Sequence, residues 1–355
     1  MVNAWQFGLL LTLLAIAGVL IVVLLLCAWW RNRRAARTHQ VELTLERMLQ
    51  SWIDRSPSPP ELDWLNLLNA ADRRVLFRFC IRMLPSLPGN AGERARGALR
   101  HAGLVVWQLA RLRARSPAER AEACAILGRL GLADAVPLLV ERLGDRDARV
   151  RRRAISALAD LQAVERLDAI ADAIEAKGEW GNLLVVMALV RMGPASVSQI
   201  GALLENSRSP AMTKALLQVT GRLGRTDDPA AVRALAMHSD PEVRIEAVRT
   251  LGSIAPAAES VTICLAAMED SEWPARALAA WSLGRLGDER AIPRLQQAMG
   301  DPAYWVRHHT AEAIAAMGDA GEATLRRCLD DANPFVRDMA TQALFMRSVR
   351  QESAA

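Results

Sequence analysis

The chain has 355 residues, of which 52% are hydrophobic, and its 44 basic and 39 acidic residues give a formal net charge of +5. The apolar content is mainly Ala and Leu, with only 5 Phe and 1 Tyr, which favours an all-helical protein. No two cysteines lie closer than 44 residues, which argues against a zinc module or a disulfide scaffold and fits a reducing compartment; they are Cys27, Cys80, Cys124, Cys264 and Cys328.

The first predicted element is a membrane-spanning helix. Residues 7–28 form a run of 22 residues without charge, which at ~1.5 Å per residue spans roughly 33 Å, enough for a bilayer core. Trp5, Trp29 and Trp30 flank this run, as in an interfacial aromatic belt. A cleaved signal peptide is the alternative, but no Lys or Arg precedes the run and no A-x-A site follows it. We therefore predict a transmembrane anchor over residues 1–30.

Charge predicts the orientation of this anchor. Arginines follow the apolar run at once, whereas residues 1–6 carry no charged side chain; these arginines are Arg31, Arg33, Arg34 and Arg37. By the positive-inside rule, the protein is expected to span the inner (plasma) membrane once, with its N-terminus outside and residues 31–355 in the cytoplasm. The flanking tryptophans and these four arginines are the expected membrane-interface residues, because basic side chains attract anionic lipid headgroups.

The basic charge is concentrated near the membrane. Residues 31–116 hold 16 basic and 7 acidic residues, whereas residues 117–355 hold 28 and 32. The second part therefore lacks the electrostatic support that nucleic-acid binding needs, and we expect no nucleic-acid partner.

Residues 31–60 are predicted to form a basic juxtamembrane helix followed by a linker. Val41, Leu45, Leu49 and Trp52 recur at helical spacing, and the prolines of residues 56–60 end the pattern. Residues 61–116 follow as an irregular helical N-terminal cap of three or four helices, with apolar runs at 64–68, 75–84 and 99–112.

From residue 117 the sequence repeats about every 31 residues. Six of the eight units begin with an arginine, and the other two carry Asn182 and Thr213 there; the arginines are Arg120, Arg151, Arg244, Arg276, Arg307 and Arg337. An apolar or β-branched residue stands seven positions later, and a glycine usually ends the helix, as in LGRLG, LVRMG and TGRLG. Prolines just before the arginines suit the first helical turn. Each unit is thus a helix, a glycine turn and a second helix, and the units must stack as an α-solenoid.

This pattern resembles the HEAT-repeat family, and its D…VR-x-x-A-x-x-ALG-x-LGD form is similar to the short bilin-lyase-type branch. The resemblance covers residues 117–350 and implies a solenoid; residues 351–355 remain as a tail. It also implies two chemistries. Deoxyhypusine hydroxylase holds iron with His-Glu dyads at helix starts, and here only VRHHTAE, with His308 and His309, stands at that register. Nothing singles out a chromophore pocket of a bilin lyase. We therefore expect no catalytic, cofactor-binding or metal-ligating residue, and no enzyme.

The repeated arginines have two possible roles, and the cysteines in the repeats have one expected role. The arginines either line a ligand groove or form a ladder to aspartates and backbone carbonyls between units, and the ladder is favoured. Cys124, Cys264 and Cys328 fall on apolar helix faces and are expected to be small buried side chains.

Aromatic residues gather at the inter-repeat turns near the C-terminus. Trp273, Tyr304, Trp305 and Phe335 lie two or three residues before their arginines, joined by His308 and His309. Each ring either caps its own repeat against the next or forms a partner-binding surface. Phe345 extends this candidate surface, since it lies in a first helix with only residues 350–355 after it.

The sequence thus favours a membrane-anchored cytoplasmic scaffold that binds a protein partner and no cofactor. This scaffold is expected to be an accessory subunit of an envelope polysaccharide or secretion complex. The alternatives are a lyase- or hydroxylase-type enzyme on the same fold, or a membrane-organising structural protein. A convergent polar constellation would favour the enzyme.

Overall fold

The computed structural model describes residues 67–87, 90–101, 103–179, 181, 183–254 and 258–354, together with single positions between 29 and 47. Every regular element in these ranges is a helix. Contacts divide the chain into two compact units, Met1–Ala135 and Val136–Ala355. The predicted membrane segment at 7–28 and the linker at 56–60 lie outside the described residues.

The first unit contains four described α-helices: α3 (Ala70–Met83), α4 (Ala91–His101), α5 (Leu104–Arg111) and α6 (Pro117–Arg129). Its core is built around Phe77, whose buried ring stacks on Trp107 with centroids 5.9 Å apart. The apolar run at 99–112 is divided between two helices, because Gly103 adopts a left-handed φ of 66° between them. Three helices, α3 to α5, therefore occupy the segment predicted as a cap.

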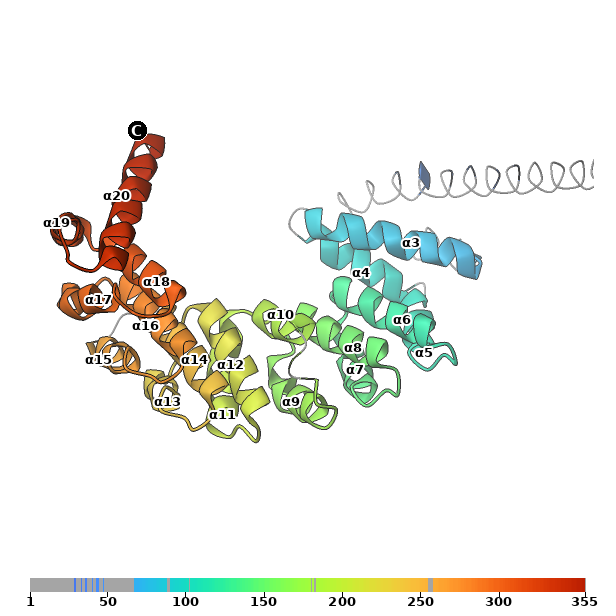
Figure 1. The fold of residues 1–355 in the computed structure, drawn as a ribbon. Helices are drawn as coiled ribbons and strands as arrows, with labels where there is room; N and C mark the ends of the chain where they lie inside the picture. The colour runs from blue at the N-terminus through green and yellow to red at the C-terminus, as the bar shows by residue number, and fades with distance from the viewer. Residues whose placement is uncertain are drawn as a thin grey trace, which may run out of the picture. The chain divides into compact units, whose positions relative to one another are not determined.

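The second unit is a series of helix pairs, whose members are α7 (Val136–Arg142), α8 (Ala148–Asp160), α9 (Leu167–Glu175), α10 (Leu183–Arg191), α11 (Val197–Glu205), α12 (Pro210–Leu223), α13 (Pro229–Leu235), α14 (Pro241–Leu251), α15 (Ala258–Ala267), α16 (Trp273–Leu286), α17 (Ile292–Ala298), α18 (Tyr304–Ala315), α19 (Gly318–Cys328) and α20 (Pro334–Ala354). Even-numbered helices contact one another in chain order, and odd-numbered helices pack against them as a second layer (Figure 1). This is the predicted all-α solenoid. The last helix continues through residues 351–354, which the sequence assigns to a tail.

The repeated arginines form the predicted ladder. In each of these six repeats, the guanidinium Nη1 donates to the backbone carbonyls five and six residues earlier, at distances of 2.6–3.2 Å; the donors are Arg120, Arg151, Arg244, Arg276, Arg307 and Arg337. Each arginine thus ties the turn between two repeats to the helix that follows. The ladder prediction is confirmed for these hydrogen bonds.

Aspartates six residues before the arginines shape the same turns. The Oδ1 of Asp270 accepts from the backbone N of Glu272 at 2.9 Å, and Asp145, Asp301 and Asp331 repeat this bond two residues on. Such a bond closes a local turn that lets the next helix begin. Prolines occupy the first helical positions as predicted.

Small residues allow the even-numbered helices to approach closely. A Cβ on Gly252 would lie 2.6 Å from the Ser282 Oγ, and one on Gly284 would lie 2.8 Å from the Ala313 Cα. Gly252 and Gly284 are therefore packing positions, while Gly287, three residues after Gly284, adopts a φ of 69° and ends the helix. Between these contacts the core is filled by buried leucines and by Cys124, Cys264 and Cys328, as predicted.

Candidate protein-binding surface

The predicted aromatic residues lie at the starts of three successive even-numbered helices. Trp273 opens α16, Tyr304 and Trp305 open α18, and Phe335 is the second residue of α20. Their side chains are 46–52% exposed, which is unusual for rings of this size. Phe345, farther along α20, is 65% exposed. The structure thus places all five predicted rings at the surface of the same unit.

Rings on α18 contact one another. Tyr304 stacks on His308 with centroids 5.8 Å apart, and Trp305 meets His308 edge-on at 5.7 Å. Trp305 also stacks on His309 at 6.0 Å. This cluster follows from helical spacing, because residues three and four apart share one face. The structure therefore joins four of the predicted side chains, Tyr304, Trp305, His308 and His309, into one group.

Phe335 joins this group through Arg307. The Arg307 guanidinium carbon lies 4.3 Å from the Phe335 ring centroid and 5.8 Å from that of Tyr304. Phe335 therefore packs partly on the preceding repeat, which agrees with the capping alternative for this one ring. Half of its surface is still exposed. The other alternative, a partner-binding surface, stays a prediction.

Farther into the solenoid, the same ladder position has a carboxylate partner. Arg244 pairs with Asp270 at 2.9 and 3.1 Å, and Arg276 pairs with Asp301 at 2.8 and 3.1 Å. The hydrogen bond from Arg244 lowers the pKa of the Asp270 carboxyl below its usual range. These two ion pairs therefore join successive repeats of the solenoid.

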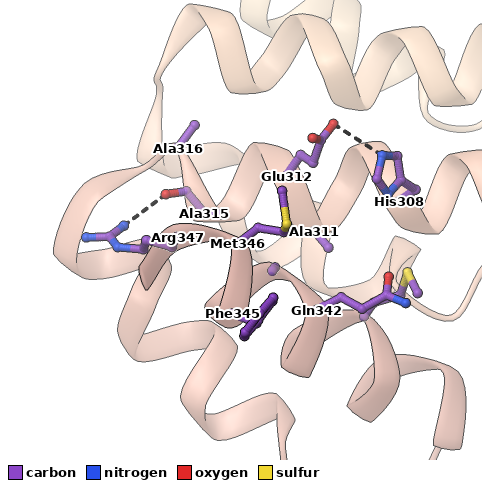
Figure 2. Close-up of a pocket in the computed structure, with 11 residues that line it drawn as sticks. His308, Ala311, Glu312, Ala315, Ala316, Gln342, Phe345, Met346 and Arg347 are labelled. Carbon is purple, nitrogen blue, oxygen red and sulfur yellow. Dashed lines mark hydrogen bonds and ion pairs between the residues drawn. The ribbon is translucent and has the colours of Figure 1, made fainter. Parts of the chain in front are cut away.

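A groove lies beside the ring cluster, between α18 and α20. It encloses about 550 Å³ and is mainly apolar (Figure 2); its lining residues are His308, Ala311, Glu312, Ala315, Ala316, Met339, Gln342, Ala343, Phe345, Met346 and Arg347. Arg347 closes one end by donating to the carbonyls of Ala315 and Gly318, each at 2.9 Å. Phe345 and Met346 on α20 face the small residues of α18 across this groove.

The sequence did not predict this groove. Its floor comes from Ala311 and Ala315, which lie four residues apart on α18 and leave room above the helix. That spacing is visible in the sequence, but alanines at this interval also occur where helices pack closely. An open groove differs from a close helix contact in one respect: among the described residues, no further helix covers this stretch of α20.

Most of the residues predicted to lie at a membrane interface are outside the described residues: Trp5, Trp30, Arg31, Arg34 and Arg37. Trp29 and Arg33 are described, and the Arg33 guanidinium carbon lies 4.9 Å from the Trp29 ring centroid. In the part of the chain that the structure describes, no single helix is long and apolar enough to cross a bilayer. One pair, Leu183–Arg191 with Pro194–Glu205, meets the length and composition requirement but bends by 100°.

Comparison with known proteins agrees with this architecture. The family described as HEAT repeats matches residues 107–189 and 229–315. None of the proteins with curated functions matches the sequence. Similar solved structures include human deoxyhypusine hydroxylase in complex with glycerol, which is 20% identical over 87% of this chain and 98% of that chain, with a TM-score of 0.31.

Two further solved structures are similar at lower identity. The complex of CpcE and CpcF of phycocyanin lyase from Nostoc sp. is 16% identical over 69% of this chain and 94% of that chain, with a TM-score of 0.33. Kap121p bound to RanGTP is 12% identical over 86% of this chain and 41% of that chain, with a TM-score of 0.49. These likenesses concern the helical architecture alone. Residues 107–189 and 229–315 thus match HEAT repeats, and the described residues form an all-helical, solenoid-like fold.

Proposed function

We propose that this protein is a membrane-anchored scaffold that binds a protein partner through the surface formed by α18 and α20. The observation that carries the proposal is the continuity between the exposed rings of Tyr304, Trp305 and Phe335 and the apolar groove lined by Phe345. Large exposed rings beside an apolar groove are the features of a protein interface. The role proposed for this surface is binding and not catalysis.

The physical basis is the burial of aromatic area. Trp and Tyr contribute large areas with few rotatable bonds, and their polar atoms satisfy hydrogen bonds at an interface. The groove accommodates an apolar side chain or one face of a helix from the partner, since 550 Å³ falls in the range of ligand-sized clefts. Trp305 and Phe345 are the expected anchors, because each is more than half exposed before binding.

The anchor and the partner's location are a further part of this proposal. Residues 7–28 span the inner (plasma) membrane once, and residues 31–355 lie in the cytoplasm. The contact between Arg33 and Trp29 is consistent with a basic, aromatic membrane border. A partner met at this surface would then belong to a membrane complex; an envelope polysaccharide or secretion complex is the candidate.

Capture of the detergent-solubilised protein with its neighbours tests the partner surface. We expect the double variant Trp305→Ala/Phe345→Ala to recover at least tenfold less partner, since truncating buried anchors typically costs ~2 kcal/mol or more. The matched control is Leu183→Ala/Met237→Ala, which removes two apolar side chains that are also more than half exposed, one at the start of α10 and one in the turn after α13. Equal recovery by both folded double variants would contradict the proposal, and loss of helical circular dichroism would show that the two rings are core residues.

Fusions to Ala355 test the anchor. A fluorescent protein at this position should be fluorescent and alkaline phosphatase should be inactive, because the C-terminus is proposed to be cytoplasmic. Active phosphatase without fluorescence would reverse the orientation. Extraction of the protein from membranes by carbonate alone would contradict a spanning anchor.

A further inference from the structure

Three side chains of residue types that commonly bind metal ions lie together on α18. His308, His309 and Glu312 occupy positions i, i+1 and i+4 of this helix. With about 100° of rotation per residue, position i+4 lies about 40° from i and 60° from i+1, one turn farther along. The three side chains therefore form a triangle on one helix face. All three donor side chains of this triangle come from one helix.

The distances in this triangle fit a metal ion. The Nε2 of His308 lies 3.6 Å from the Oε2 of Glu312, and the Nδ1 of His309 lies 3.5 Å from the same oxygen. The three donor atoms all lie within 4.8 Å of one another. Bonds of about 2.0–2.2 Å in tetrahedral geometry place donors about 3.3–3.6 Å apart. Small side-chain rotations would bring all three atoms to one ion.

The surroundings hold the imidazoles in place and leave one donor without a hydrogen bond. Tyr304 stacks on His308 and Trp305 stacks on His309, which restricts both rings before any ion binds. The Nδ1 of His309 is shielded from solvent and makes no hydrogen bond among the described residues, although the Oε2 of Glu312 lies 3.5 Å away. A shielded ring nitrogen without a hydrogen bond is costly, and a metal ion held between it and the carboxylate would satisfy it.

We propose that His308, His309 and Glu312 bind one divalent first-row transition-metal ion, with Zn²⁺ as the expected species. Two imidazoles and one carboxylate are borderline ligands suited to this class, and three protein ligands leave a coordination position open. His308 and Glu312 also line the groove between α18 and α20, so the ion lies at its border (Figure 2). Water or a donor group in the groove completes the coordination.

This site differs from the one weighed in the sequence. A site of the hydroxylase type needs ligands at equivalent positions of several repeats, and only one repeat of this chain carries histidines at that register. The structure shows that a single helix supplies three donors, because Glu312 reaches back to both histidines. The signal in the sequence is the string HHTAE, read with helical spacing.

Metal titration of the full-length, detergent-solubilised protein tests the proposal. After chelator treatment, we expect Co²⁺ to bind at one ion per chain with the intense visible absorption of a tetrahedral site, and Zn²⁺ to displace it. His309→Gln and Glu312→Gln should each weaken binding at least tenfold, while the matched control His238→Gln, which removes a histidine in the turn before α14, should leave it unchanged. Equal binding by the folded triple variant His308→Gln/His309→Gln/Glu312→Gln would overturn the site.

A second measurement does not depend on variants. X-ray absorption of the Zn²⁺-loaded wild type should show two imidazole ligands and short oxygen ligands, and a spectrum with no imidazole would overturn the assignment. Neither experiment involves the partner, so this site and the proposed protein-binding surface fail separately. Partner capture with and without chelator then shows whether the ion contributes to the docking groove.

Discussion

The ladder position has different partners in the middle of the second unit and at its C-terminal end. Arg244 and Arg276 each donate two hydrogen bonds to the carboxylate of an aspartate in the next repeat. Arg307 makes the same two carbonyl bonds but lies against the ring of Phe335. One register of the repeat therefore serves two purposes. In the middle it joins repeats by paired charge, and at the end it supports an exposed aromatic surface.

This difference shows why repeat pattern and function separate. The bonds from arginine to the turn carbonyls depend only on the local fold of one unit, so they recur wherever the arginine occurs. The outer partner of the guanidinium depends on the residue that the next turn provides, and there Phe335 stands close enough to stack. A function that differs along the solenoid is therefore expected where the turn residues depart from the repeat.

The largest expected effect comes from removing a paired arginine. Arg276→Met leaves the largely buried carboxylate of Asp301 without its partner, and we expect the free energy of unfolding to fall by about 3 kcal/mol. Arg307→Met, the matched change one repeat farther along the chain, loses the carbonyl bonds and the ring contact without exposing such a carboxylate, and should cost about 1–2 kcal/mol. Urea denaturation measures both, and equal losses would remove the distinction between the two regions.

Close helix packing gives the next effect. Gly284→Ala places a methyl group 2.8 Å from Ala313, so it should destabilise the protein by about 1–3 kcal/mol. The same substitution at Gly201, in α11, meets nothing within 4 Å and should stabilise the helix by up to about 1 kcal/mol. Thermal denaturation of the two variants gives opposite shifts of Tm. A stable Gly284→Ala variant would show that the repeats can separate at no cost.

Acid should weaken the middle of the solenoid through its paired aspartates. The hydrogen bond from Arg244 lowers the pKa of Asp270 in the folded protein, so this pairing stabilises the fold above the unfolded pKa of about 3.9 and is lost as pH falls below it. In the Arg244→Met variant, the free energy of unfolding should therefore decrease less than in the wild type as the pH is lowered from 5 through the pKa of Asp270. Arg307→Met should retain the slope of the wild type, and an identical flattening in both variants would contradict the assignment.

The smallest expected effect lies in the aromatic surface itself. Phe335→Leu removes the contact with the Arg307 guanidinium, and a stacked cation on a half-exposed ring contributes about 0.5–1 kcal/mol. Trp273→Leu changes a ring of similar exposure on α16 and should alter stability by less than about 0.5 kcal/mol. A larger loss for Trp273→Leu would mean that this ring caps its repeat and belongs to the core.

Much of the fold follows from the sequence, because the repeat period, the glycine turns and the arginine register are properties of each unit. The arginine ladder is an example: its carbonyl acceptors lie five and six residues before Arg151 or Arg337, within reach of one turn. The exposed rings at 304, 305 and 335 were predicted for the same reason. The groove could not be predicted, because it depends on which faces of α18 and α20 remain uncovered by helices from elsewhere in the chain.

The contribution of Glu312 was also missed, although its position is plain in the sequence. The repeat register relates His308 and His309 to other repeats, whereas Glu312 lies on the next turn of their own helix. Their distances to the Glu312 carboxylate follow from helix geometry alone. Local spacing therefore carried more information about this cluster than the repeat register did.

Site-specific photo-crosslinking tests most directly whether the C-terminal surface binds a protein partner. A benzophenone amino acid is placed at Phe345 in the groove or, as control, at Met237, which is even more exposed but lies after α13 in the middle of the unit. Irradiation of cells should give a discrete crosslinked protein from position 345 and none from position 237. Crosslinks from position 237 alone, or the same products from both positions, would contradict the proposed surface.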